Sequence, residues 1–218
     1  MCFSKEMSLG FFLIGFVASC YLKYINKINI FLPIIYFSIM ELLQYFGYLV
    51  IENKLNKLNK ILAIIIHIHI GFQPYFMNKW FSNYIPKSNL VFIPFIEKLC
   101  IVFGIFWISR LFFVDKSSIC NKKLEPNCGI KTKLRKGIRH IIHVARSRGP
   151  NYITPSIFMH FFLFFIPILF LGVDKFVYSL ILLFGILGWI LATNIHEAAS
   201  IWCLLSIPSL VIPLIYKC

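Results

Sequence analysis

Seven hydrophobic stretches, each about as long as a membrane is thick, dominate this chain of 218 residues. They cover residues 8–26, 30–51, 60–78, 90–114, 153–172, 175–194 and 197–216. A helix needs about 20 mostly apolar residues to cross the hydrocarbon core of a bilayer. Open strands are excluded there, because backbone polar groups in lipid must be satisfied internally. The sequence therefore predicts an all-α, polytopic membrane protein with a single seven-helix transmembrane domain, and we expect no strands.

The composition supports the same prediction. Hydrophobic residues make up 59% of the chain and charged residues 14%, whereas soluble domains carry roughly 45–50% apolar and about 25% charged residues. The first stretch lacks a strongly basic leader and a small-residue cleavage site, so we expect a retained helix rather than a signal peptide. The connections are short except for residues 115–152, which we expect to form a basic loop.

Lysine and arginine are divided unequally between the two ends of the predicted bundle. Fourteen lie at the end that holds the N-terminus and the 115–152 loop, and six lie at the opposite end. Because Lys and Arg collect in cytoplasmic loops, we expect the N-terminus in the cytosol and the C-terminus outside. We expect the basic loop to bind anionic lipid headgroups. Its charge would also suit nucleic acid, but we expect no specific nucleic-acid partner.

The long loop contains a test of this orientation. It carries Cys120 and Cys128, which should remain reduced thiols in the cytosol. In the inverted orientation the same two cysteines become a plausible disulfide. The charge count itself depends on this loop, because without its ten Lys and Arg residues the two ends carry four and six.

Several polar side chains fall inside the predicted spans, where a charge costs at least ~2.5–3.5 kcal/mol. At a rise of about 1.5 Å per residue, Glu41, Gln44, His69 and His160 all lie roughly 10–15 Å from the same end of the bundle. His69 shares a helix face with Gln73, four residues later, as Glu41 does with Gln44. The spacing predicts that these two pairs face each other in an interior cavity, with His160 nearby.

His67 and His69 are two residues apart, so they point to nearly opposite sides of a regular helix and cannot hold one ligand together. A hydrogen bond to a neighbouring helix is the simpler interpretation of His67. The same interpretation stays open for the whole polar set, because polar side chains also hold membrane helices together.

A second group of reactive side chains is expected at the mouth of the bundle on the N-terminal side. Its members are Cys2, Ser4, His140, His143 and Glu197. On a helix, His140 and His143 would share one face, which suits a metal ion, although a surface helix without a ligand explains them equally well. Removal of the initiator methionine would leave Cys2 with an amine beside its thiol. Cys2 and Glu197 therefore join the candidate catalytic residues.

Five segments together resemble a known family: MCFSKEMSLG, FSIMELLQYFGYLVI, HIGFQPYF, GPNYITPSIFMHFFLFFIP and EAASIWCLLSIP. The chain is similar to short multi-pass membrane proteins that begin Met-Cys-Phe/Trp-Ser and occur in large DNA viruses and in various microbes. The resemblance implies no activity. It implies these signature positions: Cys2, Ser4, Glu41, Gln44, His69, Gln73, Cys120, Cys128, His140, His160, Glu197, Trp202 and Cys203. It thereby adds Trp202 to the cavity candidates, and it implies an aromatic residue where this chain has His143.

The sequence leaves three functions open. The first is an intramembrane enzyme acting on a lipid-like substrate, in which Glu41, His69 and His160 bind Zn or Fe or act as base and acid. Such an enzyme would be a metal-dependent hydrolase; alkaline ceramidases are similar in having seven spans, but their paired histidines are missing from the last span here. The second is a proton-coupled transporter or channel, although no internal repeat is visible. The third is a receptor or scaffold without chemistry.

Overall fold

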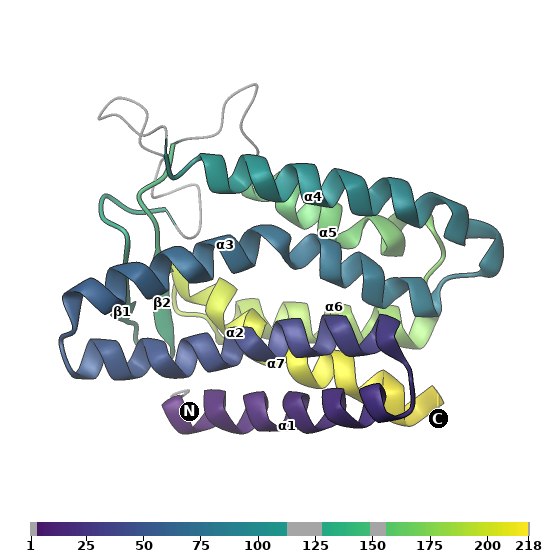
Figure 1. The fold of residues 1–218 in the computed structure, drawn as a ribbon, viewed down its shortest axis with the longest axis horizontal. Helices are drawn as coiled ribbons and strands as arrows, with labels where there is room; N and C mark the ends of the chain where they lie inside the picture. Colours follow the sequence, from purple (N-terminus) through teal and green to yellow (C-terminus); the bar gives the residue numbers. More distant parts are fainter. Residues whose placement is uncertain (1–3, 113–127, 149–155, 218) are drawn as a thin grey trace.

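The computed structural model describes residues 4–112, 128–148 and 156–217. In these ranges seven α-helices lie along one axis and alternate in direction (Figure 1). They are α1 (Lys5–Tyr24), α2 (Ile28–Glu52), α3 (Asn56–Phe81), α4 (Ile93–Ser109), α5 (Ile157–Phe170), α6 (Lys175–Leu191) and α7 (Ile195–Lys217). Two 3-10 helices, η1 (Ser82–Tyr84) and η2 (Lys87–Phe92), connect α3 to α4. The prediction of a mostly helical chain is confirmed.

Side-chain caps define where four of the helices begin. Ser4, Ser156 and Asp174 cap α1, α5 and α6 by accepting hydrogen bonds from backbone N–H groups of the first turn. Asn194 caps α7 in the same way. These N–H groups have no partner within the helix, so a cap stabilises the start by about 0.5–2 kcal/mol. Asp174 and Asn194 lie in the short turns that join α5 to α6 and α6 to α7. Consecutive helices of these three therefore run in opposite directions.

Small residues let the helices approach one another closely. A Cβ atom at Gly15 of α1 would overlap the Ser38 hydroxyl of α2. A Cβ atom at Gly104 of α4 would lie 2.6 Å from a ring carbon of Phe72 on α3. Helices in lipid associate mainly through such tight packing, because lipid is as apolar as their own side chains.

Five helices are long and apolar enough to cross a membrane: Lys5–Tyr24, Ile28–Glu52, Asn56–Tyr84, Lys87–Ser109 and His196–Leu214. The remaining two predicted spans correspond to shorter apolar helices. α5 has 14 residues and α6 has 17, so at about 1.5 Å per residue they measure roughly 21 Å and 26 Å. Both are shorter than the ~30 Å hydrocarbon core of a typical bilayer.

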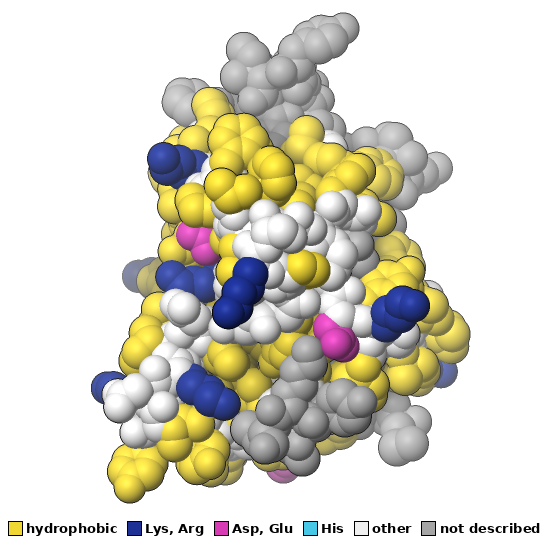
Figure 2. Space-filling view, turned by 90° about the vertical axis from the view of Figure 1, so that its right-hand side faces the viewer, with side chains coloured by type: hydrophobic (Ala, Val, Ile, Leu, Met, Phe, Trp, Pro, Cys, Tyr) yellow, Lys and Arg dark blue, Asp and Glu magenta, His cyan; other side chains and the backbone are white. Residues whose placement is uncertain are grey.

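Large apolar side chains cover the outer faces of the helices. Val17 is 66% exposed, Phe95 is 64% exposed and Ile186 is 55% exposed. Figure 2 looks at the end of the bundle opposite the N-terminus, where scattered basic side chains lie among backbone and other side chains, and hydrophobic side chains form much of the rim. Such extended exposed apolar surface is typical of proteins that contact lipid or a partner.

Residues 133–144 contradict the expectation that the chain has no strands. β1 (Lys133–Lys136) and β2 (Ile141–Val144) form an antiparallel hairpin in which Leu134 lies opposite His143. Every residue of β2 is buried, whereas β1 buries only Leu134. The β-branched residues of Ile-Ile-His-Val favour a strand, but a four-residue strand is too short to show a period. The prediction of a helix that carries His140 and His143 on one face is therefore wrong.

Two side chains fix this hairpin to the helices. Asn59 of α3 accepts a hydrogen bond from the Leu134 N–H at 2.7 Å and donates one to the Leu134 carbonyl at 3.0 Å. The Glu197 carboxylate, in the first turn of α7, accepts hydrogen bonds from the backbone N–H groups of Ile138 and Arg139 in the hairpin turn. Glu197 is fully buried, so backbone N–H groups replace the water that a carboxylate otherwise needs.

Gly137 leaves the room that Glu197 occupies, because a Cβ atom there would overlap Glu197 Oε1 and the His140 carbonyl. We expect Gly137→Ala to displace the carboxylate from the turn and to lower the free energy of unfolding by roughly 1–3 kcal/mol, the usual cost of overpacking. Gly10→Ala is the control, because a Cβ atom there has no neighbour within 4 Å. Thermal unfolding in detergent measures the stability of the two variants. Equal melting temperatures for the two variants would contradict the proposed anchor.

Candidate functional site

A cavity of about 50 Å³ lies inside the bundle, between α2, α3, α5, α7 and the hairpin. A space of this size holds a few water molecules or one small polar group. The polar residues that line it come from all five elements: Gln44, Gln73, His143, His160, Ser200 and Cys203. The structure therefore places Gln44, Gln73 and His160 in one lining, whereas Glu41 and His69 of the predicted set do not line it.

Several polar atoms of this lining have no hydrogen-bond partner within the described part of the chain. They are Gln44 Oε1 and the Nδ1 atoms of His143 and His160. Gln73 does have a partner, because its Nε2 donates to Cys203 Sγ at 3.4 Å and so joins α3 to α7. An unpaired buried polar group costs about 1–3 kcal/mol, and most are paired with protein or water. The lining is therefore suited to hydrogen bonds with a guest molecule.

Two buried imidazoles lie against Trp107 of α4, and a third lies against one of these two. The His67 and Trp107 ring centroids are 5.2 Å apart, and those of His143 and His67 are 5.8 Å apart. The His160 and Trp107 ring centroids are 5.9 Å apart. Burial lowers the pKa of His143 to about 4, so this imidazole is neutral at pH 7. Its Nε2 meets the Ala63 carbonyl oxygen at 2.9 Å and so carries the proton, which leaves Nδ1 as an acceptor.

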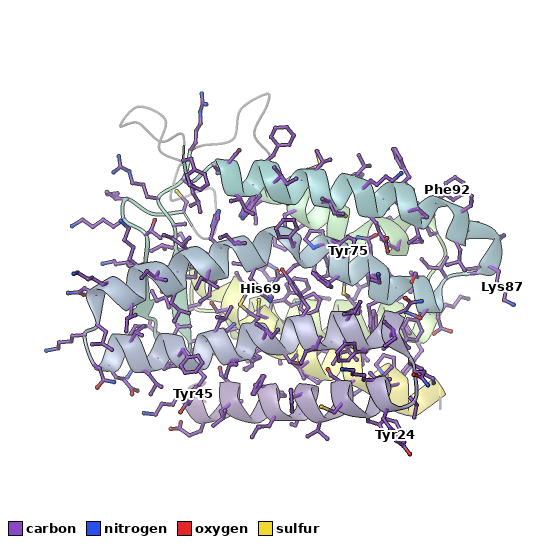
Figure 3. All side chains as sticks on the ribbon, viewed as in Figure 1. Tyr24, Tyr45, His69, Tyr75, Lys87 and Phe92 are labelled. Carbon is purple, nitrogen blue, oxygen red and sulfur yellow. The ribbon has the colours of Figure 1, made fainter. Side chains whose placement is uncertain are left out.

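His69 does not line the cavity, because it pairs with Tyr36 of α2. His69 Nε2 donates to the Tyr36 carbonyl at 2.9 Å, and the Tyr36 hydroxyl donates to the His69 carbonyl at 2.5 Å. The two rings stack with centroids 3.9 Å apart, and Figure 3 shows His69 between α2 and α3. His67 contacts α4 instead, so the two histidines do face opposite sides of α3. The Tyr36–His69 pair has the geometry of a bond between helices.

Glu41 is fully buried on α2 beside the cavity but does not line it. Neither carboxyl oxygen has a hydrogen-bond partner among the described residues. Ser8 of α1 faces the carboxyl group without meeting it in hydrogen-bond geometry. Cys203, which lines the cavity, is near enough to interact with Glu41 electrostatically.

The predicted metal ligands Glu41, His69 and His160 therefore lie in three different environments. Within the described ranges, no group of three or more His, Cys, Asp or Glu residues is placed to hold a metal ion. The arrangement does not fit the Zn or Fe site that the sequence suggests, and we derive no step through a metal.

A second, shallower pocket of about 280 Å³ lies at the N-terminal end of the bundle. Ser4, Tyr48 and His140 line it beside the hairpin turn that Glu197 holds. His140 Nδ1 lies 2.9 Å from the Tyr48 hydroxyl. Burial lowers the pKa of His140 to about 3, although the nearby Glu197 carboxylate acts in the opposite direction. The structure thus brings Ser4, His140 and Glu197 to one end.

The other members of the predicted sets are distributed elsewhere. His143 faces the inner cavity rather than the N-terminal pocket, and Trp202 of α7 also lines that cavity. Cys2 lies outside the described residues. Sequence reasoning assigned no cavity role to His143 or Cys203. The strand pairing that turns His143 inward is not visible in the sequence, and Cys203 appeared only among the positions that the resemblance marks.

The start of the hairpin region is constrained by a disulfide. Cys128 is disulfide-bonded and forms a backbone bridge with Ala145, whereas Cys20, Cys100 and Cys203 are free. Cys120, its partner in the sequence-based alternative, lies outside the described residues.

Comparison with known proteins adds one finding. A family model described as a family of unknown function, DUF5765, matches residues 6–217. No curated protein and no solved structure matches the chain.

Proposed function

Since the chain belongs to the family of unknown function DUF5765, we propose its function from the geometry of the cavity. We propose a multi-pass membrane protein whose interior cavity binds the polar part of a lipid-like molecule. The observation that carries this proposal is that three residues with unpartnered polar atoms, Gln44, His143 and His160, line one cavity inside the bundle.

The membrane part of the proposal rests on the shape and surface of the bundle. The seven helices alternate in direction, so each helix carries the chain from one end of the bundle to the other (Figure 1). Five are long enough to span a bilayer, and local thinning of the bilayer accommodates shorter helices such as α5 and α6. The exposed Lys and Arg residues of β1 would then meet lipid headgroups.

Structural bonding between helices explains the cavity residues less well than ligand binding does. Where Tyr36 and His69 join α2 to α3, they exchange two hydrogen bonds, although His69 Nδ1 has no partner among the described residues. Gln44 Oε1 and His160 Nδ1 lack such partners within the described residues, and both residues line the same cavity. A guest that hydrogen-bonds to them would remove the cost of leaving them unpaired.

We also propose that the protein catalyses a reaction of the bound lipid-like molecule. His160 and His143 are the imidazoles that line the cavity, and imidazole is the commonest general acid or base. The Cys203 thiol lies beside them, with Gln73 donating to its sulfur. An enzyme acting on a lipid-like substrate would therefore use these side chains. Proton-coupled transport and a scaffold without a ligand are the alternatives, and the following experiment separates the scaffold from both.

The cavity variants Gln44→Leu and Gln73→Leu keep side-chain volume but remove hydrogen bonding. We expect wild-type protein, purified in mild detergent, to retain a lipid-like molecule in native mass spectrometry and both variants to lose most of it. Tyr36→Phe is the control, because it removes the hydrogen bond to the His69 carbonyl and should lower stability by about 0.5–1.5 kcal/mol without affecting retention. The same bound molecules in wild type and both cavity variants would contradict the proposal and favour a scaffold.

For orientation, we propose that the hairpin end faces an oxidising compartment, the reverse of what the Lys and Arg count predicts. Disulfides persist mainly outside the cytosol, and Cys128 is disulfide-bonded, whereas the charge count depends on one segment. In intact cells, Cys128 should resist a maleimide reagent until a reductant is added, as a gel shift on a chain that lacks the free cysteines Cys20, Cys100 and Cys203 would show. Labelling of Cys128 without reductant would restore the cytosolic assignment.

A further inference from the structure

An apolar groove of about 380 Å³ lies on the outer surface where α5, α6 and α7 meet. Phe165 of α5 and Ile181, Leu182 and Ile186 of α6 line it, together with Trp202 of α7. α5 and α6 are consecutive but scarcely touch, because α5 packs on α3 and α4 while α6 packs on α7. The side of the bundle therefore has a seam between these two helices.

The groove adjoins the inner cavity. Phe161, Trp189 and Trp202 line both of them. The Trp202 ring lies 4.6 Å from the Phe164 ring and 6.4 Å from the Phe161 ring, measured between centroids, so aromatic side chains bridge α7 and α5. A thin aromatic layer thus lies between the inner cavity, which holds a few polar groups, and the apolar groove on the outer surface.

We propose that the ligand is an uncharged amphiphile with a single hydrocarbon chain, which enters sideways from the bilayer between α5 and α6. Its chain lies in the groove, and its polar group passes Trp202 to reach Gln44, Gln73 and His160. This inference rests on the proposed function and adds the class of ligand and its route.

The lining of the cavity selects against a charged group. None of the described residues that line it is Lys, Arg, Asp or Glu, and His143 is neutral at pH 7 because burial lowers its pKa. An unpaired ion is far more costly to bury than a hydroxyl, ester or amide that finds hydrogen bonds. Gln44 Oε1 offers an acceptor, and the Gln73 amide offers donors. A space of about 50 Å³ accepts such a group but leaves no room for a second chain.

Two glycines of α6 show where the groove can be blocked. At Gly188 a Cβ atom would lie 3.3 Å from Trp202 Cβ, so α6 presses directly on α7 there. At Gly185, which lines the groove, a Cβ atom would meet only Trp202 Nε1, at 3.7 Å. A larger side chain at position 185 can therefore extend into the groove without a backbone clash and occupy the space of the ligand's chain.

The test is equilibrium binding of radiolabelled 1-oleoylglycerol to the purified full-length protein by scintillation proximity. We expect Gly185→Leu to weaken binding roughly tenfold or more, which corresponds to about 1.4 kcal/mol. Gly10→Leu is the matched control on α1, where a Cβ atom has no neighbour within 4 Å, and it should bind as wild type does. Oleate and lysophosphatidylcholine, which share the chain but carry charge, should compete at least tenfold less well. Ile186→Trp is a second variant that should block the groove, and it serves as the test if Gly185→Leu does not fold.

The outcomes separate the route from the proposed function. Wild-type affinity in both Gly185→Leu and Ile186→Trp, with loss in Gln73→Leu, would overturn the sideways route and leave the cavity as the binding site. Equal competition by the charged probes would overturn the uncharged polar group. No binding of 1-oleoylglycerol to wild-type protein, with a different retained molecule in native mass spectrometry, would overturn the ligand class alone. No binding and no retained molecule would overturn both proposals.

Discussion

The cost of leaving a polar group unpaired in apolar surroundings governs the interior of this bundle. Where two helices meet at Tyr36 and His69, the two residues exchange hydrogen bonds through side-chain and backbone atoms. At the N-terminal end, backbone N–H groups of the hairpin turn satisfy the buried Glu197 carboxylate. The cavity differs in bringing several residues with unpartnered polar atoms into one lining, namely Gln44, His143 and His160, within the described structure. A cavity lined in this way is where a ligand or ordered water is expected.

The cavity depends on the hairpin as much as on the helices. Ile141 and His143 of β2 form part of its lining, and Asn59 and Glu197 hold the hairpin in place from α3 and α7. In a bilayer a strand pair is tolerable only where protein covers it, and here β2 is buried along its whole length. The basic segment therefore contributes both a charged outer edge and an apolar wall of the site.

Much of the architecture follows from the length and polarity of the helices, and the sequence predicts it. The depth of Gln44 and His160 along their helices, and the helix face predicted for Gln73, also place these three residues near one another, but the same reasoning wrongly adds Glu41 and His69 to the cavity lining. The hairpin could not be predicted, because four-residue strands flanked by Lys and Arg show no period, so the inward turn of His143 was missed as well. Helix spacing places His69 on the same face as Gln73. It does not show that Tyr36 lies opposite His69 and that the Tyr36 carbonyl accepts a hydrogen bond from the imidazole. Which residues of two neighbouring helices form a hydrogen bond depends on how each helix is rotated about its axis and shifted along it. A single sequence does not show either quantity.

The central claim is that one amphiphile occupies the groove and the cavity together. Photo-crosslinking tests it most directly, with a monoacylglycerol that carries a diazirine in mid-chain, incubated with the protein in lipid nanodiscs and mapped by mass spectrometry. The account predicts saturable crosslinks concentrated on the groove wall at Phe165, Ile181 and Ile186, and their loss in excess unlabelled 1-oleoylglycerol. Crosslinks spread over exposed apolar residues such as Val17 of α1 and Phe95 of α4, unaffected by competitor, would contradict it.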